Sequence, residues 1–359
     1  MDTRIKQIDG LRGSAVLLVV CFHLFNNNYA STAVSQLNSM EVFLMYATSF
    51  GWCGVNLFFV LSGFLIVSKL LSQKDRPNFF RNFFIRRFFR IVPLYYVFLV
   101  LFLIIRFFIN DNSLQMFDGN IPIYTYFLFI QNLYMSVLGH FGPNVLTPSW
   151  SLAVEEQFYL IIPFLVYWLK SKQVVFVSIV FVFYALFNRF TASNWFEEYT
   201  HFLSRVDALF LGVLYAFGRF YKINYYYYLK NYLFRVFSFL LIFILYFNYY
   251  FFNHLLISYF FLIILDIVLD LKADNKLANI FLNPVLIWVG KKSYFIYLFH
   301  QLIVGLCFFL FQYGSNPNLA SFNSYIIVVF GICVTLVFSM MSEKYFESKM
   351  ISLGHILTK

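Results

Sequence analysis

An arginine and a histidine near the start of the chain are spaced so that one membrane helix could hold both. Arg12 lies in the run Asp9–Gly13, and His23 follows inside an apolar segment. If residues 14–25 are helical, the step from Arg12 to His23 is about 16 Å along the axis, from one membrane face towards the middle. Ionisable side chains at that depth cost about 2.5–3.5 kcal/mol on insertion scales, so they predict a functional site.

We expect His23 to act as a general base, and two glutamates are the acidic residues best placed to assist it. Glu155 and Glu156 follow Trp150 near the predicted outer end of a later apolar segment. Because His23 enters from the inner side, these groups could meet near mid-membrane. We expect one carboxylate to fix the tautomer of His23 and to stabilise the imidazolium that forms. Ser62 lacks the Gly-x-Ser-x-Gly elbow of a serine nucleophile.

Further polar residues lie in apolar segments. Arg205 and Asp207 stand two positions apart, and we expect them mainly to satisfy other buried charges. His300 lies about two turns into a later segment. Both substrate contact and an interhelical hydrogen bond remain open for this residue. The candidates for substrate contact are Trp150, Tyr159 and His300, and those for stabilising an oxyanion are Ser62, Asn56 and Tyr159.

A basic cluster lies between positions 69 and 90. Its members are Lys69, Lys74, Arg76, Arg81, Arg86, Arg87 and Arg90. A phosphorylated ligand and anionic lipid headgroups would both suit such a cluster. Arg87 and Arg90 are three residues apart, so on a helix they share a face and could bind one phosphate together.

Membrane helices must position all of these groups. The chain has 359 residues, of which 61% are hydrophobic and 12% charged. Apolar runs of about 20 residues recur along its whole length, which is typical of a polytopic helical membrane protein and excludes a soluble globule. We expect an all-α bundle that forms a single integral membrane domain over residues 1–359.

Ten spanning segments are predicted, and charge sets their orientation. They are 14–30, 50–71, 88–109, 150–169, 173–188, 201–217, 232–249, 254–271, 293–312 and 324–341. With both termini in the cytoplasm, every Lys and Arg except Arg106, Arg189 and Arg205 falls inside, as the positive-inside rule requires. An eleventh span at 121–138 would turn the later basic loops outward. We therefore expect 110–149 to be an outer-face excursion that dips into the membrane or lies on it.

Six motifs occur along the chain in a fixed order. They are Asp9–Gly13 with His23, Gly54–Phe64, Arg86–Tyr95, Pro148–Tyr159, Arg205–Leu209 and Ser293–His300. Together they resemble those of the acyltransferase 3 family of integral membrane acyltransferases over nearly the whole chain. One departure is Tyr345, which stands where many members of that family carry proline.

The resemblance implies transfer of an acyl group, usually acetyl, from a cytoplasmic thioester to a hydroxyl of a cell-envelope glycan. It implies that Arg12 and His23 form the essential Arg-x10-His pair and that Arg87 and Arg90 meet coenzyme A. We add Arg86 to the residues expected to bind the donor phosphates. Arg12 could either hold the donor or stabilise charge at the thioester carbonyl. The chain ends at Lys359, so we expect the stand-alone type that has no SGNH hydrolase-like domain.

These observations predict a multi-pass O-acetyltransferase of the bacterial inner membrane. We expect acetyl-CoA as donor, no metal, a glycan or lipid-linked glycan as acceptor, contact with membrane lipids and no nucleic acid. O-antigen of lipopolysaccharide, or a related surface polysaccharide, is the expected acceptor. Another envelope glycan, a secreted small molecule and a succinyl donor remain open. The alternative from a different class is a transporter or flippase of lipid-linked sugars, although the internal repeats common in transporters are not seen.

Overall fold

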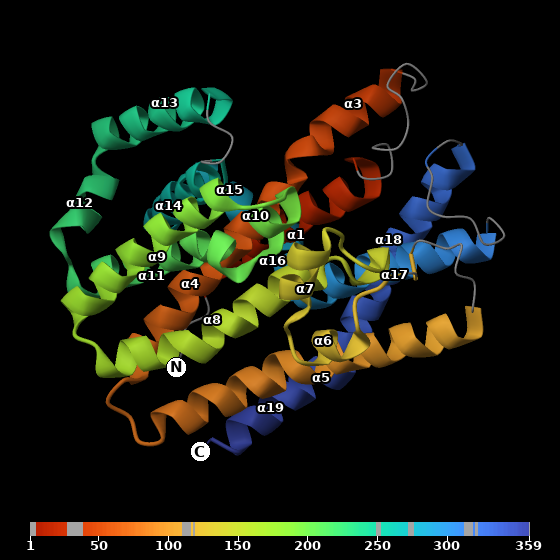
Figure 1. Ribbon diagram of the computed structural model, residues 1–359, viewed down its shortest axis with the longest axis horizontal. Coiled ribbons are helices and arrows are strands. Elements are labelled where there is room, and N and C mark those ends of the chain that lie inside the picture. The colour runs from red at the N-terminus through yellow and green to blue at the C-terminus, as the bar shows by residue number, and fades with distance from the viewer. Residues whose placement is uncertain are drawn as a thin grey trace.

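The computed structural model describes residues 5–26, 39–109, 116–117, 119–248, 253–271, 276–311, 319 and 322–358. Every regular element in these ranges is helical, and none is a strand (Figure 1). The first half contains α1 (Lys6–Cys21), η1 (Phe22–Asn26), α3 (Ser39–Thr48), η3 (Ser49–Cys53), α4 (Gly54–Gln73), α5 (Phe79–Ile109), α6 (Ile123–Phe127), α7 (Gln131–Leu138), η4 (Asn144–Leu146) and α8 (Ser149–Trp168).

The second half contains α9 (Ser171–Thr191), α10 (Trp195–Thr200), α11 (Phe202–Tyr221), α12 (Asn224–Lys230), α13 (Tyr232–Asn248), α14 (Asn253–Asp270), α15 (Lys276–Phe281), α16 (Pro284–Lys291), α17 (Ser293–Phe311), α18 (Phe322–Ser342), η6 (Glu343–Glu347) and α19 (Ser348–Ile356). Two of these elements, η1 and η6, are π-helical turns that continue α1 and α18. Such turns occur frequently at functional sites.

The predicted all-α membrane bundle is confirmed. Within the described residues, seven helical stretches are long and apolar enough to cross a membrane. A described helix also lies at each of the ten predicted positions. Three of these helices, α8, α11 and α13, are not among the seven stretches. Charged residues interrupt α8 and α11, whereas α13 has only 17 residues. The number of crossings and the side of each terminus therefore stay predictions.

The ambiguous stretch 121–138 forms two short helices instead of one spanning helix. α6 has five residues and α7 has eight, too few to cross a bilayer. Gln131 and Asn132 in α7 are fully buried, and Gln131 Nε2 donates to the carbonyl of Ser149 at 2.8 Å. Irregular backbone at membrane depth is tolerated where protein surrounds it and satisfies its polar groups. The structure thus contains no eleventh spanning helix at this position.

Glycine allows the helix that carries Arg12 to pack directly on the backbone of α16. A Cβ on Gly13 would fall 2.1 Å from the carbonyl oxygen of Leu286, and one on Gly290 would fall 1.8 Å from that of Asp9. Only glycine permits so close an approach of two backbones. The contact fixes Arg12 beside the junction of α16 and α17.

Candidate active site

Two histidines from distant parts of the chain form a hydrogen-bonded pair. His23 lies in η1 and His300 in α17, and His23 Nδ1 is 2.9 Å from His300 Nε2. Their planes differ by 12°, and their centroids are 5.1 Å apart. The distance between the centroids equals about the nitrogen–nitrogen distance plus the radii of the two rings, so the two nitrogens lie nearly on the line that joins the centroids. The rings are therefore nearly coplanar and joined edge to edge.

The contacts of His300 assign the tautomers of the pair. Its Nδ1 lies 3.0 Å from the carbonyl oxygen of Ile296 and 2.9 Å from that of Tyr297. A carbonyl only accepts, so Nδ1 of His300 carries the proton, and in the neutral ring Nε2 is the acceptor. His23 Nδ1–H must then donate to it. This leaves Nε2 of His23 with a lone pair, as a general base requires.

Accessibility separates the two rings. His23 keeps part of its surface exposed, whereas His300 is 1% exposed. Both ring nitrogens of His300 are already bonded to protein atoms. His23 is thus the less buried ring of the pair, and for His300 the structure shows the interhelical hydrogen bond rather than a free nitrogen for a substrate.

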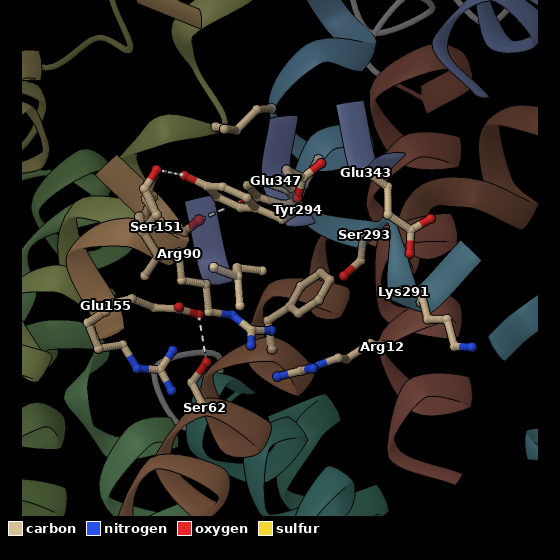
Figure 2. A pocket seen from close by; sticks show the side chains of 18 of the residues that line it. Arg12, Ser62, Arg90, Ser151, Glu155, Lys291, Ser293, Tyr294, Glu343 and Glu347 are labelled. Atoms are coloured by element: carbon tan, nitrogen blue, oxygen red, sulfur yellow. Dashed lines mark hydrogen bonds between the residues drawn. The ribbon is translucent and has the colours of Figure 1, made fainter. Parts of the chain in front are cut away.

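The structure also contains a cavity of about 250 Å³, shown in Figure 2, which neither His23 nor His300 lines. α1, α4, α5, α8, α16, α17, η6 and α19 contribute its walls. Tyr297 lines it and stands one turn before His300 on α17. The polar residues that line it are Arg12, Ser62, Arg87, Arg90, Ser151, Glu155, Tyr159, Lys291, Ser293, Tyr294, Tyr297, Glu343, Glu347 and Ser348.

Four cations from three helices meet at the cavity: Arg12, Arg87, Arg90 and Lys291. Figure 2 shows the side chains of Arg12 and Arg90 extending into the space between the helices. The Arg87 guanidinium lies 5.0 Å from the centre of the Tyr159 ring. Several cations around one cavity provide charge-assisted donors for a phosphorylated ligand. The structure thus brings Arg12 together with the Arg87 and Arg90 pair.

The predicted carboxylate partner of His23 is not what the structure shows. Glu155 lines the cavity, where Oε1 accepts from Ser62 Oγ at 3.0 Å and Oε2 from Tyr159 OH at 2.8 Å. Neither bond involves His23. Glu156 follows it on α8, and its Oε1 is buried with no hydrogen-bond partner among the described residues. α8 therefore directs Glu155 to the cavity, and the partner of His23 comes from α17.

The three candidates for stabilising an oxyanion all have protein partners. Ser62 and Tyr159 donate to Glu155. Asn56 Nδ2 donates to the carbonyl of His254 at 2.9 Å and to Ser258 Oγ at 2.8 Å. Each would have to give up a hydrogen bond within the protein to serve an oxyanion.

Arg86 differs from its neighbours. Its Nε donates to Thr358 Oγ1 at 2.8 Å, and it does not line the cavity. Arg86 lies only about 40° around the helix from Arg90, so its bond to Thr358, and not its helix face, separates it from the cavity. The expectation that Arg86 binds the donor is not supported, because this side chain joins α5 to the end of the chain.

Arg205, Asp207 and Trp150 belong to a separate buried network. Asp207 pairs with Arg189 at 2.8 Å, which confirms that it satisfies another buried charge. Arg205 donates to His254 Nδ1 at 2.5 Å, and its guanidinium lies 5.4 Å from the centre of the Trp150 ring. Trp150 is 3% exposed and does not line the cavity. Of the predicted substrate contacts, only Tyr159 reaches the cavity.

Sequence reasoning missed the contribution of the C-terminal segment. Glu343 and Glu347 of η6 line the cavity, together with Lys291 and Ser293 at the junction of α16 and α17. Lys292 Nζ, next to them, forms an ion pair with Glu343 at 2.5 Å. Glu343 and Glu347 are four residues apart, and this spacing could have suggested that they share a helix face. Charges after a last span, however, look like a cytoplasmic tail.

The fold and the site together define a helical membrane protein with a hydrogen-bonded histidine pair and a cavity at which four cations meet. The chain belongs to the acyltransferase 3 family: the family described as an acyltransferase domain matches residues 5–343. It is therefore a multi-pass membrane protein of an acyltransferase family.

Two relatives carry names that specify the acyl group. Peptidoglycan O-acetyltransferase OatA of Listeria monocytogenes is 37% identical over 175 residues, which are 46% of this chain and 25% of that protein. A Staphylococcus aureus protein named "Putative O-acetyltransferase SACOL0978" is 27% identical over 96% of this chain and 57% of its own length. The chain thus spans between a quarter and somewhat more than half of these relatives. No solved structure matches it.

Proposed function

We propose that the protein transfers an acetyl group from acetyl-CoA to a hydroxyl of a cell-envelope glycan, with His23 as the general base. One observation carries the proposal: the contacts of His300 leave Nε2 of His23 unprotonated, and the helix that holds His300 also lines the cavity with the four cations. Its partner His300 follows Tyr297, a residue of the cavity wall, by one turn of α17.

The cavity is assigned to the phosphate-bearing part of acetyl-CoA. About 250 Å³ is less than a typical pocket for a whole ligand, so the cavity holds only a portion of the donor. Arg87 and Arg90 bind phosphate oxygens, and Arg12 and Lys291 add positive charge. The pantetheine arm then runs past Tyr297 and brings the thioester towards His23.

The reaction balances without water or a redox partner. Nε2 of His23 takes the proton of the glycan hydroxyl, and the oxygen attacks the thioester carbonyl. The new ester C–O bond forms, the C–S bond breaks, and its electron pair leaves on the sulfur of coenzyme A. The proton then passes from His23 to that sulfur, giving the free thiol and a neutral imidazole.

The donor cavity is assigned to the cytoplasmic side of the inner membrane, and the acceptor approaches from the outer side. The distribution of Lys and Arg supports this orientation. In a cysteine-free background, an impermeant maleimide should label His140→Cys in intact cells and Lys170→Cys only after permeabilisation. The reverse pattern would contradict the orientation.

Two acceptor classes are weighed: a surface polysaccharide such as O-antigen, and peptidoglycan. The name of the Listeria monocytogenes relative includes peptidoglycan, which favours the second class. That similarity covers 46% of this chain, and both classes are glycans of the cell envelope.

Mass spectrometry and NMR of the separated polysaccharide and peptidoglycan fractions test this function. Cells with the wild-type protein should show an alkali-labile acetyl ester in one fraction, and cells with His23→Ala should lack it. Immunoblots of the membrane fraction must show equal amounts of both proteins. Full acetylation by His23→Ala would refute the assignment of the base, and unchanged glycans in a gene deletion would refute the function.

A further inference from the structure

We infer that His300 is the positioning residue of the reaction. It fixes His23 in the tautomer whose Nε2 is free and stabilises the imidazolium that forms there. This inference rests on the proposed role of His23 as base. The buried ring of His300 then serves to orient His23, and it neither contacts the substrate nor merely fills space in the core.

The bonding of His300 leaves it no capacity for a reactant. Nδ1–H is directed at the carbonyls of Ile296 and Tyr297, and the lone pair of Nε2 faces His23. A neutral imidazole has one donor and one acceptor, so both are used. At 1% exposure the ring is also buried.

The backbone carbonyls make the direction of the bond unambiguous. Neither can donate, so neutral His300 cannot carry its proton on Nε2. If His300 gained a second proton, Nε2–H would donate to His23, and the remaining proton of His23 would sit on Nε2. His23 would then have no lone pair for the substrate. Only the neutral pair leaves the base ready, and the geometry of α17 selects that state.

The same chain of bonds stabilises the charge that develops. When His23 Nε2 accepts the hydroxyl proton, the bond from its Nδ1–H to His300 becomes charge-assisted and strengthens. The two carbonyls polarise the far end of His300, since linked hydrogen bonds reinforce one another. In serine hydrolases a buried aspartate orients the histidine and stabilises its charged form. Here a second histidine, anchored on helix carbonyls, takes that place.

Enzyme assays on two substitutions of one residue test the inference. His300→Ala removes the acceptor, and its kcat should fall by about 10²-fold, the usual range for a general-base contribution. Its KM for acetyl-CoA should stay within about twofold of wild type, because the cavity is intact. His300→Gln places an amide oxygen where Nε2 stood, so its kcat should recover to within about tenfold of wild type. Wild-type kcat in His300→Ala would overturn the inference, as would equal loss in both variants.

The tautomer gives a readout independent of activity. In protein with 15N-labelled histidine, the signals of His23 are those missing from His23→Ala. In the wild type they should show a protonated Nδ1 and an unprotonated Nε2. His300→Ala, if it folds, should shift His23 towards protonated Nε2. A proton on Nε2 in the wild type would overturn the inference whatever the variants do.

A matched control and the His23 variant separate the possible failures. His140 lies outside the pair and the cavity, and its Nδ1 accepts from the Gly142 amide at 3.0 Å. His140→Ala should therefore keep wild-type kcat and the His23 tautomer. If His23→Ala is active, the proposed function fails. If His23→Ala is inactive while His300→Ala is fully active, only the positioning role fails.

Discussion

Arg86 and Arg87 are neighbours in sequence but serve different parts of the structure. Arg86 Nε donates to Thr358 Oγ1 at 2.8 Å, at the C-terminal end of the described chain. Arg87 lines the cavity, and its guanidinium lies 5.0 Å from the centre of the Tyr159 ring. The basic cluster on α5 thus contains one residue bound to the end of the chain and two residues that line the cavity.

The division predicts different kinetics for neighbouring substitutions. Arg87→Ala or Arg90→Ala should raise the KM for acetyl-CoA about tenfold, since a hydrogen bond to a charged group contributes about 1.5–3 kcal/mol. Arg86→Ala should leave that KM unchanged and lower the melting temperature in detergent, because α5 loses its bond to Thr358. Arg81→Ala, on the exposed part of the same helix, is the control for both measurements. An equal rise in KM in all four variants would mean that the whole cluster acts by general attraction.

Glu155 offers a test between a role at the cavity and a role at His23. Its oxygens accept from Ser62 and Tyr159, and it shares the cavity with the cations. Glu155→Gln removes a negative charge there and turns one acceptor into a donor. We expect a KM for acetyl-CoA changed by about three- to tenfold, as one altered charged hydrogen bond implies, with kcat within about threefold. If Glu155→Gln loses as much kcat as His300→Ala while KM is unchanged, Glu155 would instead assist His23 in its role as the base.

The helices and the cationic cavity could be predicted from sequence because they follow short-range rules. Apolar runs and the positive-inside rule place helices at all ten predicted positions, and the spacing of Arg87 and Arg90 puts them on one face. The partner of His23 could not be predicted in this way. His23 and His300 lie 277 positions apart, on different helices. Helical periodicity shows which side chains share one face of a helix, but not which distant helix that face meets.

Expectation and structure differ at the C-terminus for a related reason. Positive and negative residues after the last apolar run are typical of a solvated tail. In the structure, η6 turns Glu343 and Glu347 to the cavity, and α19 lies along α5 (Figure 1). A π-helical turn changes the direction of the following residues, and helical periodicity alone does not predict it.

The backbone contact at Gly290 predicts a strong effect from one methyl group. Gly290→Ala would place Cβ 1.8 Å from the carbonyl oxygen of Asp9, so α1 and α16 must separate. Overpacking of this kind costs about 1–3 kcal/mol, and it would also displace Arg12. We expect a lower melting temperature and a raised KM for acetyl-CoA. Gly305→Ala is the matched control, because its nearest neighbour would be the Met116 side chain at 3.3 Å. Equal melting temperatures for the two variants would contradict the close packing.

The ion pair between Arg189 and Asp207 tests whether the second network is structural. Both side chains are buried, and Nη2 of Arg189 lies 2.8 Å from Oδ2 of Asp207. Arg189→Met leaves a buried carboxylate without its cation, which should destabilise the protein by about 3–5 kcal/mol. Arg189→Met combined with Asp207→Leu should recover most of that loss, because replacing both charges removes the unpaired one. Unfolding in detergent measures the stability of the wild type and of both variants. Acetylation should follow stability, so a fully stable double variant without activity would show that the pair also serves the reaction.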